Sequence, residues 1–178
     1  MAHVFESAPT GRAKCRGCGE PIGKGDIRFG ERLPNPFAEG EMTLWFHPIC
    51  AAYKRPEPML ETLAASTGEV PDREKLEIAA KASVAHRRRD RIDGAERAKG
   101  QATCRHCREP IPKGAWRIRL TFFDEGQFSG GGFIHLACIP PYFETSDILE
   151  QVLHFSRGLS ADDREELGKA ISAAVPTA

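Results

Sequence analysis

The sequence has no long hydrophobic run. No apolar stretch approaches the roughly 20 residues of a membrane-spanning helix, and the N-terminal segment MAHVFESAPTGR lacks the apolar core of a signal peptide. We therefore expect an intracellular protein without a membrane segment, in a compartment where thiols stay reduced. The composition, with 40% hydrophobic and 28% charged residues, is that of an ordinary folded protein.

Two further features are missing, a catalytic motif and a net charge. The sequence contains no carboxylate pair, no nucleophile elbow and no phosphate-binding loop. Its 25 Lys and Arg residues balance 25 Asp and Glu residues, which argues against a nonspecific polycation. The charges are nevertheless segregated, since residues 97–119 are mainly basic and residues 57–77 mainly acidic. A localised basic face on a neutral protein indicates an anionic partner of defined shape.

What the sequence does contain is an internal duplication. The segment AKCRGCGEPIGKGDIR at residues 13–28 returns as ATCRHCREPIPKGAWRIR at residues 102–119. HPIC at residues 47–50 returns as HLAC at residues 135–138, and a helix with the pattern D-R-E-x-L follows each copy. The chain is therefore a tandem repeat of one unit.

All six cysteines lie inside the repeat. The spacing is C-x2-C-x28-H-x2-C in the first unit and C-x2-C-x27-H-x2-C in the second. An odd number of cysteines per unit does not suit internal disulfides, whereas a Cys3His set is a closed tetrahedral site for structural zinc. Because a closed set leaves no position for water or substrate, we predict two structural zinc ions and no enzymatic activity. The predicted ligands are Cys15, Cys18, His47, Cys50, Cys104, Cys107, His135 and Cys138.

The duplication and the zinc sites together predict the domain organisation. Residues 1–84 form the first unit and residues 97–178 form the second. Domains of this size often need a bound metal ion or a disulfide for stability. Residues 85–96 are interpreted as a basic linker or an extension of the first unit's helix. The expected fold is small α+β: two tandem zinc-stapled units, each a short antiparallel sheet around a Cys3His site followed by a packed helix.

In each unit, the segment between the Cys-x2-Cys pair and the His-x2-Cys pair, here called the spacer, predicts a strand with arginine on one face. Residues 27–33 and residues 116–122 alternate between apolar and polar positions with period two. Because arginine occupies the open face in both copies, beside further basic residues, we predict contacts with phosphate. The predicted strand contacts are Arg28, Arg117 and Arg119.

Each spacer also carries an aromatic residue in a loop rich in Pro or Gly. LPNPFAEGEM contains Phe37, and DEGQFSGGGF contains Phe128. Such a side chain either folds back as a plug under its hairpin or forms a platform for an unpaired base. Base stacking of that kind is worth roughly 1–3 kcal/mol per base. The spacing alone leaves both alternatives open.

The segment GRAKCRGCGEPIGKGDIRF, followed by WFHPIC and a helix, resembles the poly(ADP-ribose) polymerase-type zinc finger. That finger occurs in tandem at the start of the polymerase and singly in DNA ligase III. The resemblance extends over roughly residues 5–82 and 95–172. It implies recognition of nicks, gaps and ends in DNA through backbone contacts and stacking of apolar loop residues on exposed bases. Nothing in the sequence resembles the polymerase's catalytic domain or a ligase core.

The resemblance also implies roles for single residues. It places Arg12 and Arg28 at positions that hold phosphate, and Met42 near an apolar stacking position with Phe37 as its companion. In the second unit Arg117 matches Arg28.

Two functions follow as hypotheses. The first is a non-enzymatic, zinc-dependent protein that recognises DNA strand breaks in repair or damage sensing, as a monomer and together with a repair-protein partner. It would act at DNA, in the nucleoid of a bacterium, which the short Ala- and Arg-rich chain favours, or in a eukaryotic nucleus. The second is a zinc-stapled protein–protein adaptor without a direct DNA role, whose basic strand meets an acidic partner.

Overall fold

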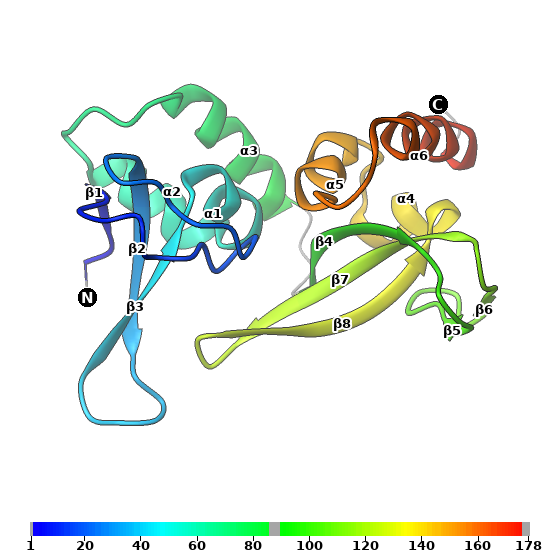
Figure 1. The fold of residues 1–178 in the computed structure, drawn as a ribbon, viewed down its shortest axis with the longest axis horizontal. Coiled ribbons are helices and arrows are strands. Elements are labelled where there is room, and N and C mark those ends of the chain that lie inside the picture. Colours follow the sequence, from blue (N-terminus) through cyan, green and yellow to red (C-terminus); the bar gives the residue numbers. More distant parts are fainter. Residues whose placement is uncertain (1, 86–89, 176–178) are drawn as a thin grey trace. The chain divides into compact units, whose positions relative to one another are not determined.

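A computed structural model describes residues 2–85 and 90–175 (Figure 1). The described residues form two compact units, one made of residues 2–85 and 124–128 and the other made of residues 90–123 and 129–175. In this part of the chain, every helix is too short or too polar to cross a membrane. Each unit contains an antiparallel sheet and its own helices, so the predicted α+β fold is confirmed.

The first unit is built on a three-stranded sheet in the order β1-β2-β3. The strands are β1 (Val4–Ser7), β2 (Ile27–Pro34) and β3 (Glu41–Phe46), and both pairings are antiparallel. Gly30 pairs with Trp45, and a side chain at Gly30 would collide with the indole ring at 2.6 Å. Glycine at this position therefore lets Trp45 lie across the neighbouring strand.

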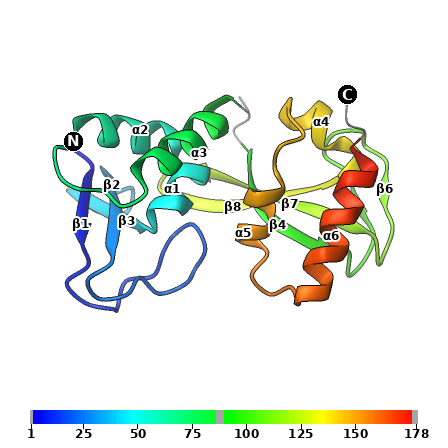
Figure 2. The ribbon, with the colours of Figure 1, turned by 90° about the horizontal axis from the view of Figure 1, so that it is seen from above.

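Three helices complete the first unit, α1 (Pro48–Lys54), α2 (Pro56–Ala65) and α3 (Arg73–Ala85). Proline begins both α1 and α2, where its missing N–H costs no hydrogen bond. Helix α1 lies between the sheet and α3, and α2 packs on α3 (Figures 1 and 2). The core between them is apolar and contains Ile22, Phe29, Phe46, Met59 and Leu63.

The second unit repeats the sheet with longer strands. Its three-stranded sheet has the order β4-β7-β8, from β4 (Asp90–Arg97), β7 (Trp116–Asp124) and β8 (Gln127–His135). A small second sheet pairs β5 (Ala102–Thr103) with β6 (Pro110–Ile111) around the cysteine turn.

The helices of the second unit begin at its His-Cys pair. They are the short η1 (Leu136–Cys138), then α4 (Ile139–Phe143), α5 (Leu149–Phe155) and α6 (Ala161–Ala174). Helix α5 lies along β4, as Figures 1 and 2 both show. Helices α3 and α6 are the predicted D-R-E-x-L helices, and each turns leucine inward, at Leu76 and Leu167.

The interpretation of residues 85–96 as a linker or helix extension is wrong for residues 90–96. These residues form most of β4 and pair with β7, with an irregularity between Ile92 and Ala95. Ile92 and Ala95 are buried, while Gly94 adopts a left-handed conformation at the irregularity. This break in register interrupts the alternation of buried and exposed residues along β4, so the sequence pattern does not indicate a strand. Residues 86–89 lie outside the described part of the chain.

Candidate zinc sites and nucleic-acid interface

Each unit gathers its four predicted ligands into one cluster. In the first unit Cys15 and Cys18 come from the turn before β2, and His47 and Cys50 come from the start of α1. In both units the four ligand atoms lie within 4.8 Å of one another. Zinc bonds to sulfur at about 2.3 Å and to nitrogen at about 2.0 Å, so a tetrahedral ion fits between atoms at this separation. The eight residues are Cys15, Cys18, His47, Cys50, Cys104, Cys107, His135 and Cys138.

The two histidines are oriented alike by a backbone carbonyl. The Nδ1 atom of His47 lies 3.4 Å from the sulfur of Cys18, and its Nε2 lies 3.2 Å from the carbonyl oxygen of Pro21. The matching distances for His135 are 3.4 Å to Cys107 and 3.0 Å to Pro110. A proton on Nε2 that is donated to the carbonyl leaves the Nδ1 lone pair for the metal. This outer contact is typical of zinc-bound histidine and supports the metal assignment.

The sulfur atoms also perturb one another's ionisation. Hydrogen bonds from Cys15 and Cys50 hold the pKa of Cys18 well below its usual value, whereas contacts with Cys15 and Cys18 raise the pKa of Cys50. Hydrogen bonds with Cys15 and Cys18 raise the pKa of His47 to about 10. The three sulfurs are therefore close enough to influence one another's charge, as the ligands of a single metal ion must be.

The phosphate contact predicted in the first unit, Arg28, is held inside the protein. Only 7% of Arg28 is exposed. Its Nε and Nη2 atoms both donate to one carboxylate oxygen of Glu6 on β1, at 3.1 and 2.5 Å. The guanidinium lies 3.5 Å from the centre of the Trp45 ring. The open face that the alternation predicted is therefore covered at this position by a carboxylate and an indole.

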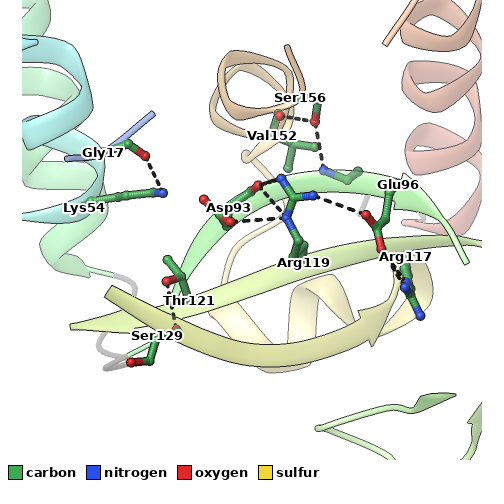
Figure 3. Close-up of polar contacts among 11 residues, drawn as sticks. Gly17, Lys54, Asp93, Glu96, Arg117, Arg119, Thr121, Ser129, Val152 and Ser156 are labelled. Carbon is green, nitrogen blue, oxygen red and sulfur yellow. Dashed lines mark hydrogen bonds and ion pairs between the residues drawn. The ribbon is translucent and has the colours of Figure 1, made fainter. Parts of the chain in front are cut away.

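The second unit holds its strand arginines in the same way but with more carboxylates (Figure 3). Arg117 donates to Glu96 at 2.6 Å and stacks on Phe133 at 3.5 Å. Arg119 uses all three of its nitrogens, with Nε and Nη2 on Asp93 and Nη1 on Glu96. Burial would raise the pKa of Glu96, but Arg117 and Arg119 outweigh it and lower that pKa.

Other basic side chains remain available at the cysteine turn of the first unit. Arg12, Lys14 and Arg16 are exposed, and their side chains form no ion pair with any other residue in the described ranges. Of these three, the resemblance had already placed Arg12 at a position that holds phosphate. The cysteine turn therefore presents accessible positive charge in addition to the strand, where Arg28 is buried.

The loop aromatic of the first unit lies at the surface. Phe37 is 76% exposed between β2 and β3, and its backbone N–H donates to the side chain of Asn35 at 2.9 Å. Met42 pairs with Leu33 near the same hairpin tip. Phe37 therefore does not plug the core. Phe128 is the second residue of β8 and lies in the segment 124–128, which groups with the first unit.

Sequence reasoning missed the carboxylates that bind the strand arginines. Glu6 precedes Cys15 by nine residues and Glu96 precedes Cys104 by eight, so the repeat itself contains the signal. The signal becomes useful only once β1 is known to pair with β2 and β4 with β7, because those pairings bring glutamate beside arginine.

Comparison with known proteins agrees with this geometry for the first unit. Residues 6–87 match the family model described as "Poly(ADP-ribose) polymerase and DNA-Ligase Zn-finger region". This range includes the whole first ligand set and the strand β2 that carries Arg28.

Curated relatives extend the similarity into the second unit. The chain is 28% identical to poly [ADP-ribose] polymerase 1 of Oryza sativa subsp. japonica over 75% of its length, and 28% identical to the Drosophila melanogaster enzyme over 78%. It is 27% identical to poly [ADP-ribose] polymerase 1 of Gallus gallus over 94% of its length. The chain spans only 14–19% of these relatives.

These relatives are eukaryotic and lend no support to the bacterial source predicted above. The matches do support a zinc-dependent DNA-binding role. Two Cys3His sites, a matching family model and relatives that cover most of the chain lead to one conclusion. The predicted resemblance is confirmed: residues 6–87 match the zinc finger of the poly(ADP-ribose) polymerase type, and a second unit with the same ligand set follows.

Proposed function

We propose that this protein recognises DNA strand breaks, such as nicks, gaps and ends, in DNA repair or damage sensing. The observation that supports this proposal most is the exposure of Phe37 on a finger whose cysteine turn presents unpaired cations. Phosphate attracts such cations on any duplex, whereas an exposed aromatic ring can stack only where a base face is uncovered. The combination favours broken DNA over intact DNA.

Arg12, Lys14 and Arg16, together with Arg28, form the proposed phosphate grip. Glu6 and Trp45 hold the Arg28 guanidinium through Nε, Nη2 and one ring face, which leaves Nη1 for a phosphate oxygen. Arg117 has the same arrangement in the second unit. Arg119 would first have to leave Asp93 and Glu96, so we assign it the smallest share of any phosphate contact.

The proposed role is binding rather than catalysis. Four protein ligands complete the coordination of a tetrahedral zinc ion, and a catalytic zinc needs an open position for water or substrate. When bound, zinc would fold each unit and hold the turn that carries the cations. The partner is then DNA itself, together with any repair protein that the rest of the surface contacts.

Binding to matched duplexes tests the proposal. We expect the zinc-loaded protein to bind nicked, gapped and blunt-ended duplexes more tightly than a sealed hairpin duplex of the same sequence, in fluorescence anisotropy titrations. The double substitution of Phe37 and Met42 by alanine should weaken binding to nicked DNA by about 1–3 kcal/mol and leave binding to the sealed duplex almost unchanged.

A matched control is available on α3. Ile78 is also a large apolar residue at the surface, with 63% of it exposed, but it lies away from the hairpin and the turn. Ile78→Ala should leave both affinities unchanged. If wild-type protein binds all duplexes equally, or binds none, the strand-break proposal is wrong and the adaptor hypothesis is favoured.

A further inference from the structure

The two zinc sites share their ligands but differ in how the cysteine turn is held. We propose that the second site, at Cys104, Cys107, His135 and Cys138, is the labile one: it releases zinc first and presents Cys107 to thiol-reactive electrophiles. The second unit would then respond to zinc supply while the first unit stays folded. This inference concerns metal exchange and does not depend on DNA binding.

The turn of the first site is tied to α1. Lys54 is buried, and its Nζ donates to the carbonyl oxygen of Gly17 at 2.7 Å (Figure 3). Gly17 itself packs so closely that an added Cβ would lie 2.8 Å from the Cβ of the ligand Cys50. To release Cys18, the turn would have to break a buried, charge-assisted hydrogen bond and lose this packing.

The second site differs at both positions. His106 takes the position of Gly17, and Tyr142 takes that of Lys54, so the buried ammonium group of the first unit has no counterpart at this position. The rings of His106 and Tyr142 meet edge to face, with their centroids 6.1 Å apart. His106 and Cys107 are both exposed, whereas Gly17 is buried and Cys18 is partly buried.

Backbone strain acts in the same direction. The residue after the second cysteine of each turn is left-handed, with φ of 80° at Gly19 and 68° at Arg108. Glycine adopts this conformation freely, whereas a side chain such as that of arginine does so at a cost. The hydrogen bond that closes the turn is 2.8 Å from Gly19 to Cys15 and 3.1 Å from Arg108 to Cys104. The strained turn of the second unit should therefore open more often.

Opening of that turn has a defined chemical consequence. Exchange of zinc begins when one thiolate leaves the metal, and Cys107 is the ligand that solvent reaches most easily. Structural zinc and folding are linked, so loss of the ion should unfold the second unit. The first unit keeps its ion under the same conditions, because its turn stays closed.

Competition with a chromophoric chelator tests the inference on the full zinc-loaded chain. We expect release in two phases of one zinc each, with the faster phase about tenfold or more ahead. N-ethylmaleimide added during the fast phase, followed by peptide mass mapping, should label Cys104, Cys107 and Cys138 and spare Cys15 and Cys18. Release in a single phase, or labelling of the first unit's cysteines first, would overturn the inference.

Reciprocal substitutions separate the restraints. Arg108→Gly should slow the fast phase about five- to tenfold by removing the strain. Gly19→Arg should speed release from the first site by a similar factor, and it introduces no collision because nothing lies within 4 Å of a Cβ there. Lys54→Met should speed release from the first site alone. If Arg108→Gly leaves the fast phase unchanged, the strain does not set the rate and the inference fails.

Discussion

The first and second units have opposite chemistry at one pair of equivalent positions. In the first unit Glu31 is 1% exposed and receives two hydrogen bonds from Arg55, at 2.5 and 2.8 Å. Counting from the zinc ligands, the equivalent positions in the second unit are Leu120 and Phe143. Both of these are buried in the apolar cluster of that unit.

The two partners have changed together. A buried carboxylate without its arginine, or a buried arginine without its carboxylate, would leave an uncompensated charge, whereas an apolar pair of similar size needs no partner. The two units therefore keep the same ligand set and strand order, although a charged pair in the first unit is replaced by an apolar pair in the second. Both units keep an arginine clamp, in which a glutamate and an aromatic ring hold a strand arginine. In the first unit Glu6 and Trp45 hold Arg28. In the second unit Glu96 and Phe133 hold Arg117.

Removal of one zinc ligand should give the largest effect and show whether the units fold independently. Structural zinc contributes on the order of 10–16 kcal/mol of apparent folding free energy, more than the margin of a typical small domain. Cys18→Ala should unfold the first unit only and Cys107→Ala the second only.

The two tryptophans, one in each unit, make this measurable. Trp116→Phe leaves Trp45 to report the first unit, and Trp45→Phe leaves Trp116 to report the second. Zinc content should fall by one ion in each cysteine variant. Loss of both fluorescence signals in either variant would show that the two units depend on each other.

Exchange of the buried pair should give the next largest effect. Glu31→Leu alone leaves Arg55 without its carboxylate and should lower the free energy of unfolding of the first unit by about 3 kcal/mol. The double variant Glu31→Leu with Arg55→Phe, which copies the second unit, should recover most of the loss. Urea unfolding followed by Trp45 fluorescence in the Trp116→Phe background measures both. A double variant as unstable as the single one would show that the two interiors are not interchangeable.

The strand arginines should contribute unequally to DNA affinity. On the proposal above, Arg28→Ala should reduce the slope of log affinity against log salt by about one unit, because one phosphate contact is lost. Arg119→Ala should change the slope much less, since its nitrogens already bind Asp93 and Glu96. Titration of broken duplex at several salt concentrations measures both slopes, and equal losses would contradict the distinction.

The smallest expected effect concerns Glu96. Its folded pKa is lowered, so its contribution to stability is present above the usual carboxyl pKa and is lost as the pH falls towards the lowered value. Glu96→Gln should therefore destabilise the second unit by about 1 kcal/mol at neutral pH and by less at about pH 4. Trp116 fluorescence during urea unfolding with excess zinc measures this. Glu165→Gln, which disrupts only an exposed pair with Lys169, should be neutral at both pH values.

The ligand sets could be predicted because each half-site is local in the sequence. Cys15 with Cys18, and His47 with Cys50, are separated by two residues, so a turn or the first turn of a helix suffices to bring each pair together. Strand β4 could not be predicted, because Gly94 and the irregularity beside it interrupt its alternation. The exposure of Phe37 was left open for a similar reason, since a loop residue has no periodicity that assigns it a side.

The sequence by itself determined the duplication, the two zinc sites and the α+β class, because these depend on residue types at short, repeated spacings. Only the tertiary structure decided which charges are available. Glu6 lies 22 residues from Arg28, and the pairing of β1 with β2 turns an apparently open arginine into a clamped one. Likewise Lys54 reaches Gly17 across 37 residues and ties the cysteine turn of the first zinc site to α1. Long-range pairing of this kind depends on backbone register and packing, which a linear pattern does not contain.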